Sequence, residues 1–70
     1  ESPHLKGLVK TDKYIYVMEF KLDGSAEDAL QQINDRHYAR AFASDPRKLY
    51  KIGVNFSRET RGIEGWLVEG

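Results

Sequence analysis

The chain has 70 residues, of which 40% are hydrophobic and 31% charged, a composition that fits one small soluble domain. Eleven Lys and Arg residues balance eleven Asp and Glu residues, so no overall field attracts nucleic acid, and such binding would need a local patch. The lack of cysteine excludes a disulfide framework, a thiolate zinc site and a cysteine nucleophile.

The sequence also carries no membrane or export signal. Its apolar runs fall far short of the roughly 20 residues that a membrane span needs, and no charged segment followed by an apolar run opens the chain. We therefore expect a cytoplasmic protein without a membrane partner.

The first ten residues give a weak strand signal. Leu5, Leu8 and Val9 fit a strand that would form a hairpin with the next segment through Lys10-Thr11-Asp12.

The strongest signal is the segment 13–22, which is rich in aromatic and β-branched residues. Because successive strand residues point to opposite faces, its two faces both begin apolar, which predicts a central strand covered on both sides. Only Glu19 and Lys21 break this pattern. They share one face, at the C-terminal end of the strand.

A helix is predicted from Ala26 into the low forties. Ser25 is a suitable N-cap, with Asp28 three residues later in a capping-box arrangement. The helical spacing predicts one apolar stripe that extends to a half-buried His37, while two aromatic residues offset from that stripe indicate a bend. The stripe comprises Ala26, Ala29, Leu30, Ile33, His37 and Ala41, and the offset pair is Tyr38 and Phe42.

The segment 48–56 reads as a second strand, and Asp45-Pro46 ends the helix before it. Strand, helix and strand in this order predict a right-handed βαβ crossover with parallel strands. A third strand is expected at 63–68, where Trp66 would close the core, or form an interface if this strand lies at an edge. The predicted fold is therefore a single α/β domain over residues 1–70, with a mixed sheet of three or four strands and one main helix.

The pair Glu19 and Lys21 is the main candidate for chemistry. Side chains two residues apart on one strand face lie about 7 Å from each other, so both can converge on one point. A carboxylate can bind a divalent metal, and a neighbouring ammonium can orient water or stabilise charge on a phosphate. The alternative is a partly exposed salt bridge at a strand end, which is common and has little energetic effect.

The sequence segments around this pair resemble the PD-(D/E)XK nuclease superfamily, specifically the nuclease-like domain at the C-terminus of bacterial predicted AAA-ATPase-like proteins. The resemblance covers residues 8–68 and implies a restriction-endonuclease-like core, magnesium-dependent cleavage of nucleic-acid phosphodiesters, and an ATPase-like remainder of the chain as a partner. It rests on Thr11-Asp-Lys-Tyr14, Met18-Glu-Phe-Lys-Leu-Asp-Gly-Ser25, Ala29-Leu-Gln-Gln-Ile33, Tyr38-Ala39, Ile52-Gly-Val-Asn-Phe-Ser57, Glu59-Thr-Arg61, Ile63 and Trp66.

The resemblance also implies roles for individual residues. Glu19 would be the acidic metal ligand and Lys21 the lysine of the motif, while Gln32 would be the glutamine of the following helix. Gln31 and Gln32 can equally be ordinary surface residues of that helix, and Tyr38 is expected to pack rather than to reach the site.

One acidic residue of the family pattern is missing. The family carries an Asp on the preceding strand, and counting back without a gap puts Lys6 there, whereas a shift by one residue puts Gly7 there. A hard cation held by one carboxylate binds weakly, so we predict weak or no activity. The alternatives are a non-catalytic interaction module with the same fold, and a truncated domain or fragment of a longer chain that lacks an upstream helix and acid.

One further group of residues is expected to be structural. Arg36, Arg40, Arg47, Lys48 and Lys51 form a basic run, which we interpret as a solvated face at a helix end rather than a track for a phosphate backbone. A domain this small would also gain stability from oligomer contacts.

Overall fold

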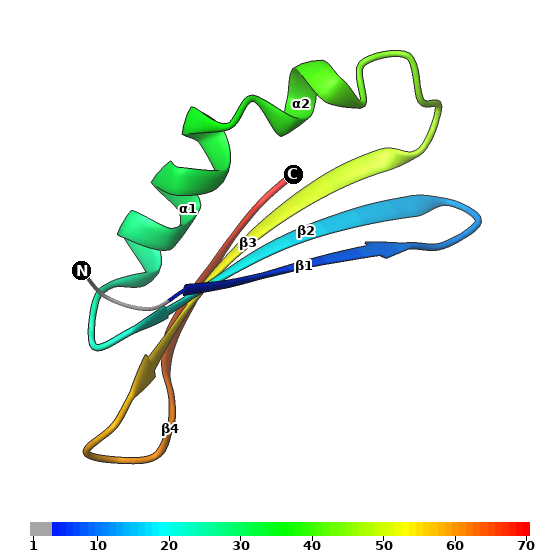
Figure 1. The fold of residues 1–70 in the computed structure, drawn as a ribbon. Helices are drawn as coiled ribbons and strands as arrows, with labels where there is room; N and C mark the ends of the chain where they lie inside the picture. Colours follow the sequence, from blue (N-terminus) through cyan, green and yellow to red (C-terminus); the bar gives the residue numbers. More distant parts are fainter. Residues whose placement is uncertain (1–3) are drawn as a thin grey trace.

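The computed structural model describes residues 4–70, with the side chain of His4 excepted, and contains one mixed four-stranded sheet with two helices. This confirms the predicted α/β class. Along the chain the elements are β1 (His4–Lys10), β2 (Tyr14–Leu22), α1 (Ala26–Asp35), α2 (Tyr38–Ala41), β3 (Lys48–Ser57) and β4 (Gly62–Glu69) (Figure 1).

The strands lie side by side in the order β1-β2-β3-β4. β1 and β2 form an antiparallel hairpin, β2 and β3 are parallel, and β3 and β4 are antiparallel. The parallel pair is joined by α1 and α2, as the order of strand and helix signals predicts. The N-terminal hairpin is likewise confirmed, and its turn is held by Thr11, whose Oγ1 accepts a hydrogen bond from the Tyr14 N–H at 2.9 Å.

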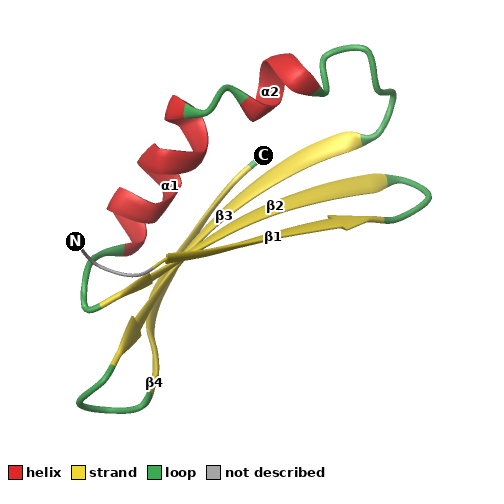
Figure 2. Cartoon of the chain, viewed as in Figure 1, coloured by secondary structure: helices red, strands yellow, loops and turns green. Residues whose placement is uncertain are grey.

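Both helices lie on one side of the sheet (Figure 2). Ser25 caps α1 as predicted, because its hydroxyl accepts a hydrogen bond from the Asp28 N–H at 3.0 Å. Ile33 of α1 packs against Ile15 and Val17 of β2, and these three residues form the core cluster. Neither helix of the described part of the chain is long and apolar enough to cross a membrane.

The opposite side of the sheet is open, so the prediction that β2 is covered on both faces is wrong for residues 4–70. We call this side the open face. Aromatic rings line it in two groups, with Tyr16 stacked on Tyr50 at 5.7 Å between centroids, and Phe20 tilted against Phe56 at 5.7 Å. Trp66 does not close the core, because β4 is an edge strand and this side chain is 66% exposed.

The predicted single helix is interrupted at His37. This residue has φ 58° and ψ 41°, in the left-handed region, and separates α1 from α2. A continuous helix would turn Tyr38 and Phe42 away from the apolar stripe, whereas the break lets both pack against the core cluster. The expected bend is confirmed, but His37 is exposed rather than half-buried.

Asp45 and Arg47 fasten the connection between α2 and β3. Arg47 donates from its backbone N–H and its Nε to Asp45 Oδ1 at 3.0 and 2.9 Å, and from Nη2 to Oδ2 at 2.7 Å. Arg47 Nη1 also reaches the carbonyl oxygen of Thr11 at 3.2 Å, which ties this connection to the β1–β2 turn. The side-chain and backbone hydrogen bonds from Arg47 lower the pKa of Asp45 to about 2.

This interaction predicts a measurable pH dependence. Because the pKa of Asp45 is lower in the folded state than its unfolded value near 3.9, its stabilising contribution is present above about pH 4 and is lost as the pH falls towards 2. We expect the melting temperature to fall less between these pH values in Asp45→Asn than in the wild type. An equal fall in both proteins, measured by circular dichroism, would show that Asp45 contributes nothing to acid sensitivity.

Candidate active site

Glu19 and Lys21 occupy the helix-covered face of β2, as strand alternation predicts. The Glu19 side chain is completely buried, with 0% exposure, and Lys21 at the strand end is half-buried. Beside Glu19 in the parallel register lies Gly53 of β3. A Cβ atom on Gly53 would lie 2.5 Å from the carbonyl oxygen of Ala26, so α1 approaches the sheet closely because this residue has no side chain.

The sheet register decides which residue of β1 faces Glu19. Lys6 pairs directly with Glu19, and Gly7 pairs with Met18. Directly opposite residues of an antiparallel pair share one face, with Cβ atoms about 4.5–5.5 Å apart. Lys6 therefore occupies the position next to the buried carboxylate, and Gly7 belongs to the open face.

Gln32 lies on α1 beside the core residue Ile33. It is half-buried, and its Oε1 atom is buried without a hydrogen-bond partner among residues 4–70. A buried amide oxygen of this kind normally accepts a hydrogen bond from a protein group or an ordered water. Gln31, in contrast, is exposed and donates to Asp35 Oδ1 at 2.9 Å, as an ordinary residue of the helix surface does.

Sequence reasoning missed a set of polar contacts at the C-terminal ends of β2 and β3. Asn55 Oδ1 accepts a hydrogen bond from the Gly24 N–H at 2.9 Å. Asp23, with φ 54°, accepts from the Arg58 backbone N–H at 3.0 Å and pairs with Arg58 Nε at 3.3 Å. An Asp-Gly pair at a strand end was a visible turn signal, but nothing in the sequence showed that it would hold the loop 58–61.

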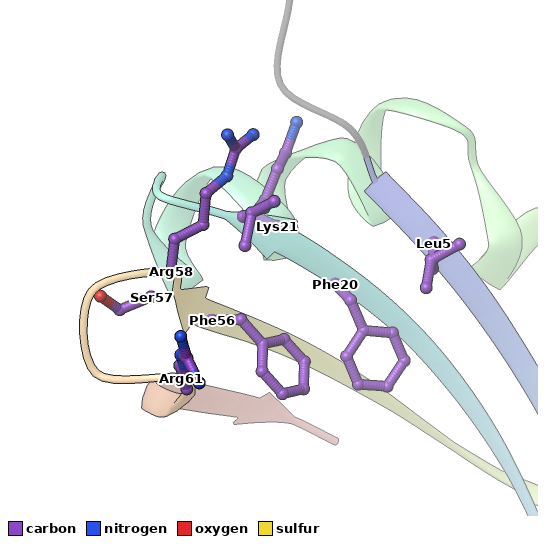
Figure 3. A pocket seen from close by; sticks show the side chains of 8 residues that line it. Leu5, Phe20, Lys21, Phe56, Ser57, Arg58 and Arg61 are labelled. Carbon is purple, nitrogen blue, oxygen red and sulfur yellow. The ribbon is translucent and has the colours of Figure 1, made fainter.

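Figure 3 shows how the side chains at these strand ends are divided between the two sides of the sheet. Lys21 and Arg58 extend to the helix side, whereas the rings of Phe20 and Phe56 extend to the open face. Leu5 of β1 borders the same apolar groove as the two rings. The charged and apolar sides of this edge are therefore distinct.

The predicted basic run does not form one surface. Arg47 is paired with Asp45, and Lys51 Nζ contacts both Asn34 Oδ1 at 2.8 Å and Glu69 Oε1 at 3.0 Å. Two cations of the basic run are therefore paired with acidic residues of the same domain. They favour the interpretation of the run as structural charge.

The residues around Glu19 do not fit a tightly held magnesium ion. Magnesium prefers oxygen ligands, usually carboxylates with several waters. In the described part of the chain, no three His, Cys, Asp or Glu side chains gather where they could hold a metal. Lys6 also places a positive charge opposite the buried carboxylate of Glu19, which opposes a cation there.

Comparison with known proteins identifies the family of the chain. Residues 8–68 were expected to resemble a nuclease family, and a family model described as the PD-(D/E)XK nuclease superfamily matches residues 5–66. Nucleases of this superfamily generally use magnesium.

One curated relative is an uncharacterized protein in the vnfD 5' region of Azotobacter chroococcum mcd 1. It is 36% identical over 58 residues, which are 80% of this chain and 11% of the relative, so the chain spans about a tenth of the relative's length. No solved structure matches the chain. The family match extends across nearly all of the described strands and helices, and the chain belongs to the PD-(D/E)XK nuclease superfamily.

Proposed function

We propose that this chain is a divergent nuclease domain in which Lys6 has replaced an acidic ligand, so that magnesium-dependent phosphodiester hydrolysis is weak or lost. The observation that carries the proposal is the direct pairing of Lys6 with Glu19 on the helix-covered face. In this proposal Glu19 would be the acidic metal ligand, and Lys21 would stabilise negative charge on a phosphate. Gln32 would accept a hydrogen bond from a water at the same site.

Nucleic acid is the substrate class within this proposal. The relative is far longer than the matched segment, which agrees with a domain that works as one part of a larger chain. An ATPase-like remainder is the partner that we propose for it.

The second candidate is an interaction module that keeps the fold without the chemistry. The open face supports it, because large apolar side chains on β1 and β4 are exposed, including Leu5 at 73% and Trp66 at 66%. Contiguous exposed apolar surface commonly marks a site of protein association.

A Mn²⁺ titration followed by amide NMR tests the proposal. We expect paramagnetic broadening centred on Glu19 and Lys21, reversed by Mg²⁺, with a dissociation constant on the order of millimolar because one carboxylate is a poor ligand set. Glu19→Gln should abolish this local broadening.

Glu64→Gln is the matched control, because it removes the same charge from an exposed carboxylate on β4. It should leave the broadening at Glu19 unchanged. Broadening scattered over surface carboxylates, with no difference between Glu19→Gln and the wild type, would refute a surviving metal site and favour the interaction module. Binding far tighter than millimolar would refute the role given to Lys6.

A further inference from the structure

We propose that Arg58 contacts a phosphate of a bound nucleic-acid strand, next to the phosphate that would lie at Glu19 and Lys21. This inference rests on the proposed function and deepens it, since it adds a substrate-contacting residue outside the Glu-x-Lys motif. It concerns the phosphodiester backbone, which DNA and RNA share.

The first step of the argument is the order of residues along the sheet. Glu19 and Lys21 follow one another on the helix-covered face of β2, about 7 Å apart. Asp23 comes next, immediately after the strand, and holds Arg58 there. The two cations therefore lie beyond the buried carboxylate in a fixed sequence, at the edge where β2 and β3 end.

The second step is the direction of the two cationic side chains. Lys21 and Arg58 both extend to the helix side of the sheet, away from the rings of Phe20 and Phe56 (Figure 3). A strand that approaches Glu19 from this edge would meet both positive charges.

The third step is the way in which Arg58 is held. Asp23 uses Oδ1 for the backbone N–H of Arg58 and Oδ2 for Nε, at 3.0 and 3.3 Å. This contact holds the Nε end of the guanidinium beside Asp23. The arginine side chain is 67% exposed, so the planar fork that binds phosphate well is accessible.

Acidic side chains near Lys21 and Arg58 confine the positive charge of this edge to a small area. Glu27 and Asp28 lie in the first turn of α1, and Glu59 follows Arg58 in the loop. With a net charge of zero, the domain has no general attraction for polyanions. Binding to a strand would therefore depend on Lys21 and Arg58 rather than on cations elsewhere.

Fluorescence anisotropy with labelled single-stranded DNA, duplex DNA and single-stranded RNA of one sequence tests the inference. The measurement uses the intact domain in EDTA, so that neither cleavage nor a metal contributes. We expect Arg58→Gln to raise the dissociation constant about fivefold and to reduce the slope of log affinity against log salt by about one. Arg58→Lys, which keeps the charge, should stay within about twofold of the wild type.

Lys13→Gln is the matched control, because Lys13 is exposed and precedes the opposite end of β2. It changes the net charge by the same amount and should leave affinity within about twofold of the wild type. Thermal melting of each variant checks that the fold is intact. Equal losses in Lys13→Gln and Arg58→Gln, no loss in Arg58→Gln, or no binding by the wild type would overturn the inference.

The anisotropy measurement and the Mn²⁺ titration test the two proposals separately. If Mn²⁺ binds at Glu19 while Arg58→Gln binds DNA and RNA like the wild type, the phosphate contact fails and the nuclease proposal stands. If no metal site is found and Arg58→Gln still loses affinity, the strand ends bind a phosphate backbone in a domain without catalysis.

Discussion

Replacing Gly53 by alanine is expected to remove most of the free energy of unfolding of this domain. The new Cβ would lie 2.5 Å from the carbonyl oxygen of Ala26 and 2.7 Å from the backbone nitrogen of Leu30. Both are backbone atoms of α1, so the whole helix would have to move away from the sheet. Overpacking of this kind costs about 3 kcal/mol at the upper end, and a core of this size supplies only about 3–5 kcal/mol.

Gly65→Ala provides the control on the same side of the sheet. Gly65 of β4 pairs with Asn55 of β3, and a Cβ atom on Gly65 would meet nothing within 4 Å. We expect this variant to keep or slightly raise the melting temperature, because alanine restricts the unfolded chain more than glycine does. Urea unfolding of both variants measures the difference. A Gly53→Ala protein as stable as the wild type would contradict the close approach of α1.

Lys6→Asp is expected to increase affinity for Mn²⁺ at Glu19 at least about tenfold. The substitution removes a like charge from the cation's neighbourhood and adds a second carboxylate on the strand residue that faces Glu19. One unit charge at 4 Å is worth about 1 kcal/mol in water and about 4 kcal/mol at an effective dielectric constant of 20. The exchange changes the side-chain charge by two units and the cation carries two charges, so even the value for water exceeds the roughly 1.4 kcal/mol that corresponds to a factor of ten. Metal-dependent cleavage of DNA or RNA should rise with the affinity.

Two controls separate the parts of this effect. Lys6→Asn removes the positive charge without adding a carboxylate, so it should give a smaller gain. Gly7→Asp adds a carboxylate to the neighbouring residue, but that residue pairs with Met18 on the open face and should give no gain at Glu19. Isothermal titration with Mn²⁺ compares the three variants with the wild type. Equal affinities in Lys6→Asp and the wild type would mean that Glu19 is not part of a recoverable metal site, and would favour the interaction module.

The fold was largely predictable because its signals are local. Alternation in 13–22 and 48–56, the cap at Ser25 and the order of elements predicted the βαβ crossover that the structure confirms. The helix break at His37 was not predictable in position, because a left-handed histidine is selected by where Tyr38 and Phe42 must pack. The open face was mispredicted for a related reason. An apolar strand face shows that burial is favourable, but it does not show which segment covers it.

The candidate site was predictable in part. Strand alternation placed Glu19 and Lys21 on one face, and the structure confirms that placement. The choice between Lys6 and Gly7 needed the hairpin register, since a shift of one residue reverses the face of every side chain. Asp23 and Arg58 are 35 residues apart in sequence, and only the parallel pairing of β2 and β3 brings them together. The roles of Glu19, Lys21 and Gln32 stay predictions until the metal titration is done.

The place of residue 6 bears on how such a domain evolves. β1 is an edge strand and Lys6 is exposed, so the fold gains little from any particular side chain at this position. Folding therefore places little constraint on the side chain at position 6, and only a role in the chemistry would require an acid there. If residue 6 holds the place of the family's acid, as we propose, a single exchange there removes a metal ligand while leaving the fold intact.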